Sequence, residues 1–169
     1  MIARTLVKLT AVSVVATGAL LCPTDVGVRA ASAADACALV TNDEAIAVIG
    51  SSVEDLAGPL VVRPGTCSWH STQSGCTMRS LSVLVSTGSA ARRLEDLRAQ
   101  STVWAAAPEV GDDAFFTADE LPTGSAVFIE HLHLRRGDTL AEVTLVGRIG
   151  PDASHDLLGR VGAAVMARL

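Results

Sequence analysis

The stretch SAVFIEHLHLRRGDTLAEVTLV, residues 125–146, carries the strongest β-hairpin pattern in the chain. Segments rich in apolar residues lie on both sides of residues 135–138. Within that turn, Gly137-Asp138 suits a two-residue connection that needs a positive φ at its first position. We therefore predict two antiparallel strands, at residues 125–134 and 139–146.

The segments on either side of this hairpin predict more of a sheet and a helix that covers it. Towards the C-terminus, residues 150–152, Gly-Pro-Asp, open a helix. Towards the N-terminus, residues 108–116 form a loop that leads into a strand, and a turn at residues 121–124 precedes the hairpin. The apolar residues of the last helix recur at helical spacing and would pack on the sheet: Leu157, Leu158, Val161, Val165 and Leu169.

The first half of the chain repeats this plan. Thr41 and Glu44 have the spacing of a capping box, and Gly50 is placed to end the helix, which predicts a helix at residues 42–49. Strands are predicted at three places, the last from alternating apolar and polar residues: 60–63, 66–71 and 79–86.

A second helix should follow Gly88-Ser89. Its pattern places Leu94 and Leu97 on the buried side and puts the charged residues outside. These charged residues are Arg92, Arg93, Glu95 and Asp96. The resulting order, α-β-β-β-α-β-β-β-α, predicts an α+β class: a single domain with helices packed on an antiparallel sheet.

The first 33 residues have the features of a cleavable signal peptide. Arg4 and Lys8 give a positive start, and an apolar run follows at residues 9–21. Residues 31–33, Ala-Ser-Ala, form the small-x-small pattern that a signal peptidase cuts. The sequence therefore predicts a signal peptide at residues 1–33, one domain at residues 34–169, and a secreted or cell-envelope location.

Two other interpretations of this leader are less favourable. A membrane-spanning helix needs about 20 apolar residues, and the apolar run at residues 9–21 is shorter, so we expect no stable span. A lipid anchor at Cys22 requires a small residue directly before the cysteine, and Leu21 is too large. We therefore expect export without lipidation.

The charge of the predicted mature chain excludes two classes of partner. Of the 13 basic and 18 acidic residues, three basic and one acidic lie in the leader, which leaves 10 and 17 and a net charge near −7. A nucleic acid or an anionic membrane surface would need a basic face, so we expect neither. Tyrosine is absent and aromatic residues are few, which leaves little with which to build a stacking surface.

The predicted mature chain holds three cysteines, Cys37, Cys67 and Cys76. In an oxidising compartment two of them should pair. A Cys67–Cys76 bridge would close a short hairpin-like loop, whereas a Cys37–Cys67 bridge would tie the N-terminal segment to the first strands. A longer loop constrains the unfolded chain more, but the residues alone leave the pairing open.

One cluster in the hairpin has the chemistry of a metal site. His131 and His133 are two residues apart on a strand and share one face, and Glu142 lies opposite one of them, depending on the turn register. Two imidazoles and a carboxylate could hold a divalent metal if a further ligand such as His70 joined them. Otherwise they form an exposed polar patch with a weak His–Glu pair, and we expect this patch and no bound metal.

No catalytic or cofactor motif stands out in the sequence. There is no Gly-x-Ser-x-Gly, His-Glu-x-x-His, phosphate-binding glycine loop or Cys-x-x-Cys. Asp112 and Asp113 are adjacent, and neighbours on an extended segment point to opposite faces, which suits no shared acid–base role. We therefore expect no cofactor and no enzyme activity. The expected role is the binding of a small ligand or an envelope protein; the alternatives are a purely structural protein and an enzyme.

Three short motifs give the chain a family resemblance. They are Cys-Ala-Leu at residues 37–39, Cys-Ser-Trp at residues 67–69, and Val-Gly-Asp-Asp-Ala at residues 110–114. In this order the chain resembles a family of exported actinobacterial proteins of unknown function, mostly lipoproteins, with a domain similar to extracytoplasmic sensor domains. The resemblance spans about residues 35–169, and the leader departs from it at the lipidation signal. It implies a Cys37–Cys67 disulfide, an unpaired Cys76 and a sensor-like or adaptor-like role.

Overall fold

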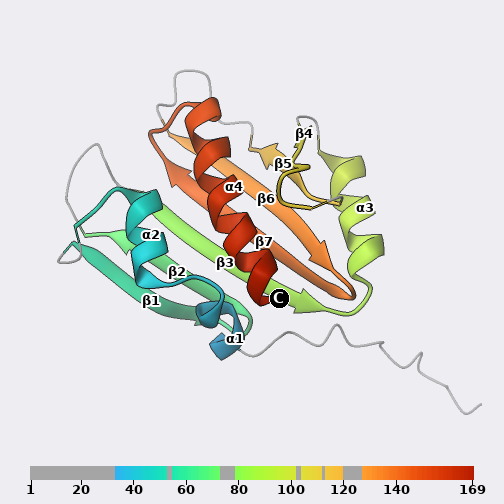
Figure 1. Cartoon of the computed structure of the whole chain (residues 1–169), viewed down its shortest axis with the longest axis horizontal. Helices are drawn as coiled ribbons and strands as arrows, with labels where there is room; N and C mark the ends of the chain where they lie inside the picture. The colour runs from blue at the N-terminus through green and yellow to red at the C-terminus, as the bar shows by residue number, and fades with distance from the viewer. Residues whose placement is uncertain (1–32, 53–54, 73–78, 102–103, 112, 120–126) are drawn as a thin grey trace, which may run out of the picture.

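The computed structural model describes residues 33–52, 55–72, 79–101, 104–111, 113–119 and 127–169. In these residues one seven-stranded antiparallel sheet, in the order β1-β2-β3-β7-β6-β5-β4, is covered by helices (Figure 1). The α+β class and the antiparallel sheet are as predicted. The elements are α1 (Ala33–Ala38), α2 (Asn42–Ile49), β1 (Leu56–Arg63), β2 (Thr66–Ser71), β3 (Ser80–Thr87), α3 (Ala90–Gln100), β4 (Trp104–Ala106), β5 (Phe115–Ala118), β6 (Phe128–Arg136), β7 (Thr139–Gly147) and α4 (Pro151–Arg168).

The predicted hairpin forms the centre of the sheet. Strands β6 and β7 are joined by Gly137-Asp138 alone, with Gly137 at φ 60°; β7 begins at Thr139 as predicted, and β6 continues two residues into the expected turn, to Arg136. Strand β3 pairs with the other edge of β7 along its whole length. The hairpin therefore joins the strands of the first half of the chain to those of the second.

One face of the sheet packs against α1, α2 and α4 and holds the main core (Figure 1). Leu132 and Leu134 of β6 point to this face and are fully buried. Helix α4 lies close to the sheet at Gly162, where a Cβ atom would lie 2.3 Å from Leu132 Cδ2 and 3.0 Å from Val110 Cγ1. A residue without a side chain at this position is what lets the helix lie so near the strands.

The N-terminal elements are tied to this core by a covalent bond and a hydrogen bond. A disulfide joins Cys37 of α1 to Cys67 of β2, with their Cα atoms 5.1 Å apart. This is the pairing that the family resemblance implied; Cys76 lies outside the described residues. Two residues along β2, the buried Trp69 donates its indole N–H to Asn42 Oδ1 of α2 at 3.1 Å.

The capping of α2 is as predicted and has a partner that the sequence does not reveal. The Thr41 hydroxyl accepts from the Glu44 N–H, the Glu44 carboxylate accepts from the Thr41 N–H, and Gly50 ends the helix in the left-handed region. The same carboxylate accepts two bonds of 2.8 Å from Arg168 at the end of α4. Arg168 also donates to the Leu39 carbonyl, so one guanidinium joins the two ends of the described chain.

The structure contains two elements that the sequence did not predict. Helix α1 falls at the predicted junction of leader and domain, and its six residues are too few to show a helical period. Strand β4 has three residues and pairs with β5 at the edge of the sheet. Strand β1 begins at Leu56, earlier than expected, across a stretch that includes Gly58-Pro59.

The other face of the sheet carries α3. Ala90 and Leu94 of this helix pack on Phe115 of β5 and Leu140 of β7 in a second, smaller core. Ser89 gives the start of α3 no side-chain bond; instead Asp138, in the hairpin turn, accepts from the Ala90 N–H at 3.1 Å. The β6–β7 turn thus fixes the beginning of α3.

The predicted leader, residues 1–33, lies outside the described part of the chain except for Ala33, the first residue of α1, and stays a prediction together with the domain boundary. Among the residues that the structure describes, none of the helices is long and apolar enough to cross a membrane.

We expect Gly162→Ala to destabilise the fold by about 1–3 kcal/mol, because the added methyl group collides with Leu132 and Val110. The matched control is Gly159→Ala on the same helix, whose Cβ would lie an unstrained 3.7 Å from Glu109 Oε1. Because alanine favours helix over glycine, the control should be neutral or stabilising by up to about 1 kcal/mol. Chemical denaturation measures both changes; equal effects would show that the close approach at Gly162 does not matter.

The bond from Arg168 lowers the pKa of Glu44 to about 2. Since the folded-state pKa lies below the ordinary value of 4.5, its contribution to stability is complete above pH 4.5 and is lost as the pH falls towards 2. We therefore expect Glu44→Gln to lower the melting temperature at pH 6 and to have little effect at pH 2. Asp43→Asn, on the neighbouring residue, serves as control. A difference between Glu44→Gln and the unchanged protein that persists at pH 2 would contradict this linkage.

Candidate functional site

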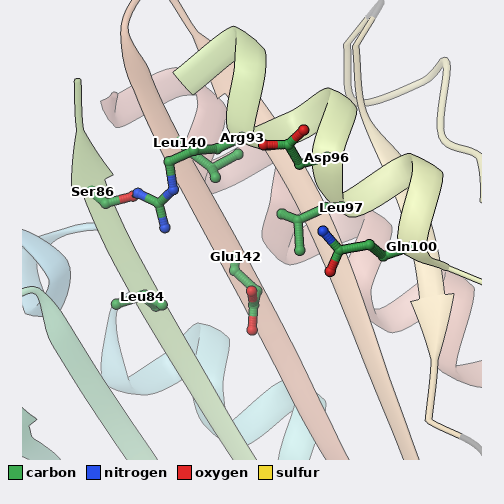
Figure 2. Close-up of a pocket in the computed structure, with 8 residues that line it drawn as sticks. All are labelled: Leu84, Ser86, Arg93, Asp96, Leu97, Gln100, Leu140 and Glu142. Carbon is green, nitrogen blue, oxygen red and sulfur yellow. The ribbon is translucent and has the colours of Figure 1, made fainter. Parts of the chain in front are cut away.

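A half-open groove lies between α3 and the sheet, with a volume of about 250 Å³. Figure 2 shows its lining: side chains from α3 on one wall and from β3 and β7 on the other. The lining residues are Leu84, Ser86, Arg93, Asp96, Leu97, Gln100, Leu140 and Glu142.

The groove follows from two regular periods. Residues 93, 96, 97 and 100 recur on one side of a helix at a spacing of three and four. On the strands, alternate residues face the same way, and each β3 residue in the groove pairs with a β7 residue there: Ser86 with Leu140, and Leu84 with Glu142. The two pairs are two residues apart, which is about 7 Å along the strands. We call these two positions along the strands the Ser86 level and the Leu84 level.

The groove has an apolar floor, a positive pole at Arg93 and a negative pole at Glu142, with Asp96 as a second carboxylate of the lining. Leu84, Leu97 and Leu140 supply the apolar surface. At the Ser86 level, the Arg93 guanidinium donates to the Ser86 hydroxyl, and none of the described carboxylates lies within ion-pair distance of Arg93. At the Leu84 level, the Glu142 carboxylate points from β7 towards the groove (Figure 2). A cation and an anion therefore face the same small volume.

Behind Glu142 lie the two histidines that the sequence singled out. Glu142 is the cross-strand neighbour of His133, which settles the register that the sequence left open. Its Oε1 atom is 3.3 Å from His131 Nδ1, and its Oε2 atom is 3.6 Å from His133 Nδ1. The far side of each ring is also held: His131 Nε2 lies 3.4 Å from Asp119, and His133 Nε2 lies 2.9 Å from the Thr117 hydroxyl.

The two histidines have opposite electrostatic behaviour. Burial favours a lower pKa for His131, but the hydrogen bond and charge of Glu142, helped by Asp119, outweigh it and raise the pKa above 6.5. His133 is more deeply buried, at 3% exposure, and burial lowers its pKa. The hydrogen bond from His131 lowers the pKa of Glu142, so that carboxylate stays ionised at neutral pH.

This arrangement corrects the expectation of an exposed patch. His133 is buried because Phe115 lies beside it, with ring centroids 5.0 Å apart, and α3 packs on Phe115. His70, the suggested further ligand, is on β2, three strand positions from β6 and level with Ile129, so it lies more than about 14 Å from His131. Among the described residues, no group of three or more histidine, cysteine or acidic side chains is arranged to hold a metal ion. The expectation of no bound metal remains a prediction.

Of the two adjacent aspartates considered in the sequence, Asp113 has a local structural partner. Asp113 forms an ion pair with Arg135 of β6, and Asp112 lies outside the described residues.

Leu60, Val61 and Val62 of the edge strand β1 are exposed apolar residues. Proline residues at 59 and 64 and breaks in the β1–β2 register bracket this stretch, and such features protect a sheet edge from pairing.

The sequence placed Arg93 and Asp96 on the solvent side of α3, and the groove was missed. The helical period does separate these residues from the buried Leu94. What it cannot show is that a sheet face runs beside the polar flank of the helix, because that depends on how α3 is docked. A polar side chain at the boundary of a helical apolar stripe is the only local signal.

No protein-family model and no curated protein matches this chain. Among solved structures, the chain is similar to the extracellular domain of PknH from Mycobacterium tuberculosis, with 11% sequence identity and a TM-score of 0.46. The match covers 83% of this chain and 97% of that domain. Membership of the exported actinobacterial family stays a prediction.

We expect His131 to titrate above pH 6.5 and His133 below it in an NMR titration of the ring protons. Glu142→Gln should lower the pKa of His131, because it removes the hydrogen bond and the charge that raise it. Since the pKa of His131 is raised in the folded state, its contribution to stability is complete below pH 6.5 and is lost as the pH rises through the folded value. The control is Glu95→Gln, an exposed carboxylate on α3. An unchanged His131 titration in Glu142→Gln would show that this pair is not coupled.

Proposed function

We propose that this protein is an extracytoplasmic binding module and that the groove between α3 and the sheet is its ligand site. The observation that carries the proposal is the convergence of Arg93 and Glu142, of opposite charge, on one small volume floored by leucines. Binding sites combine apolar lining with a few placed polar groups in this way. At about 250 Å³ the groove is slightly smaller than the usual ligand pocket of about 300–1,000 Å³, which suits only a small molecule.

The polar groups of the groove are arranged to hold a ligand. The Ser86 hydroxyl contacts the Arg93 guanidinium and not an imidazole, so it is not set up as a nucleophile with a base. Both histidines are engaged by Glu142 and by threonine or aspartate partners, which fixes the carboxylate in place. We infer a binding protein and not an enzyme.

The proposed location rests on the leader and the disulfide together. The Cys37–Cys67 bond joins an N-terminal helix to the sheet, and structural disulfides of this kind persist in oxidising compartments. The signal-peptide pattern in the sequence supplies the route there. A sensor module of the cell envelope is the role we favour.

We expect a library of small polar-apolar fragments, screened by NMR on the labelled protein, to include molecules that shift the amide signals of Leu84, Leu140 and Glu142. Gln100→Trp, which fills the groove from the exposed end of α3, should abolish these shifts. Ala99→Trp places the same bulk on the neighbouring exposed position outside the groove lining and should leave them intact.

Fragment shifts that cluster elsewhere, or that survive in Gln100→Trp as well as in Ala99→Trp, would rule out the groove as the ligand site. Both variants change exposed residues, so their melting temperatures should stay close to that of the unchanged protein.

A further inference from the structure

We propose that the ligand of this groove is a small zwitterion of the α-amino-acid type with an apolar side chain. This inference rests on the proposed function and names the chemistry of its ligand. It is drawn from three features of the lining: a guanidinium, a carboxylate pair and a leucine floor.

Arg93 is the anchor for a carboxylate. Arg93 is half-buried against the sheet, and among the described residues its guanidinium has one hydrogen-bond partner, the Ser86 hydroxyl. A guanidinium carries five N–H donors in a planar fork that matches a carboxylate, so most of its donors remain for a ligand. No described carboxylate lies within 4.0 Å of it to compete, although Asp96 follows one turn later on the same helix.

Glu142 is the anchor for an ammonium group. Its pKa is held low by His131, so it carries a negative charge at neutral pH, and the two histidines behind it fix its position. Asp96 and the Gln100 amide add two acceptors on the helix side of the same space (Figure 2). The charges facing the groove are therefore one cation and two anions, which a purely anionic ligand would not match.

The spacing of the two anchors selects the α-amino-acid arrangement. Ser86 lies on β3 and Glu142 on the neighbouring strand β7, two residues further along, so the two positions are diagonal neighbours about 8 Å apart. Two hydrogen bonds of about 2.8 Å to charged partners leave about 2 Å to 3 Å between the bound groups of the ligand. An ammonium and a carboxylate on one carbon atom have about this separation, whereas a longer ω-amino acid would have to bend.

The leucines account for the rest of the ligand. The side chains of Leu84, Leu97 and Leu140 have no hydrogen-bond donor or acceptor. The floor of the groove therefore favours the burial of an apolar ligand side chain. The groove is half-open, which leaves room for side chains of different length.

The decisive test uses L-leucine and the two molecules that each lack one of its charges, 4-methylpentanoate and 3-methylbutylamine. Calorimetric or NMR titration of the purified protein should give L-leucine an affinity about ten to a hundred times that of either half-molecule, because each lacks one charge-assisted contact. L-leucine that binds no better than the half-molecules would overturn the proposal without any variant being made.

Two variants test whether Arg93 binds the carboxylate of the ligand. Arg93→Gln should weaken L-leucine by about tenfold or more while leaving 3-methylbutylamine unchanged, because the amine has no carboxylate to lose. Arg92→Gln, the exposed neighbour outside the groove lining, should change neither. Equal losses for leucine and the amine in Arg93→Gln would mean that Arg93 does not act as the carboxylate anchor.

The outcome also separates this inference from the function it rests on. One outcome is that fragments bind, that Gln100→Trp blocks their binding, and that L-leucine does not bind. The groove is then a ligand site for another class of molecule, and the proposal of a zwitterionic ligand is wrong. If neither binds, both proposals fail.

Discussion

The side-chain alternation of the β6–β7 hairpin is the constraint on which the rest of this structure depends. Along β6, Leu132 and Leu134 point to the face under α4, and the residues that alternate with them, His131 and His133, point to the face under α3. A shift of one residue in the register with β7 would exchange the two sets and bury both histidines in the main core. The two-residue turn at Gly137-Asp138 fixes that register, and its aspartate also caps α3.

Glu142 connects the two halves of the polar face. On one side it faces a histidine pair, with His131 Nδ1 3.3 Å and His133 Nδ1 3.6 Å from its oxygens, and on the other it supplies the negative pole of the groove. Because the histidines hold it ionised and in place, a ligand that binds there does not have to order the carboxylate itself. The same connection means that a bound cation and a protonated His131 compete for one negative charge. Ligand binding should therefore be sensitive to the charge state of His131.

Most elements could be predicted from the sequence because their signals are local. The capping box at Thr41, the glycine that ends α2 and the period of α4 each involve residues within a few positions of one another. The cluster of His131, His133 and Glu142 was predicted too, since a hairpin brings its own strands together. The burial of that cluster was not predictable, because the cover comes from Phe115 and α3, which lie outside the hairpin. The groove was missed for the same reason.

The sequence by itself determined the class of fold, the central hairpin, the bounds of α2, the starts of α3 and α4, and a set of residues with polar chemistry on one strand face. Only the tertiary structure decided where α3 lies, that Cys37 and Cys67 are paired, and that Arg93 and Glu142 face one volume. The physical reason is distance along the chain. Asp138 begins α3 from 48 residues away and Arg168 reaches Glu44 across 124, and contacts over such separations leave no periodic trace in the sequence.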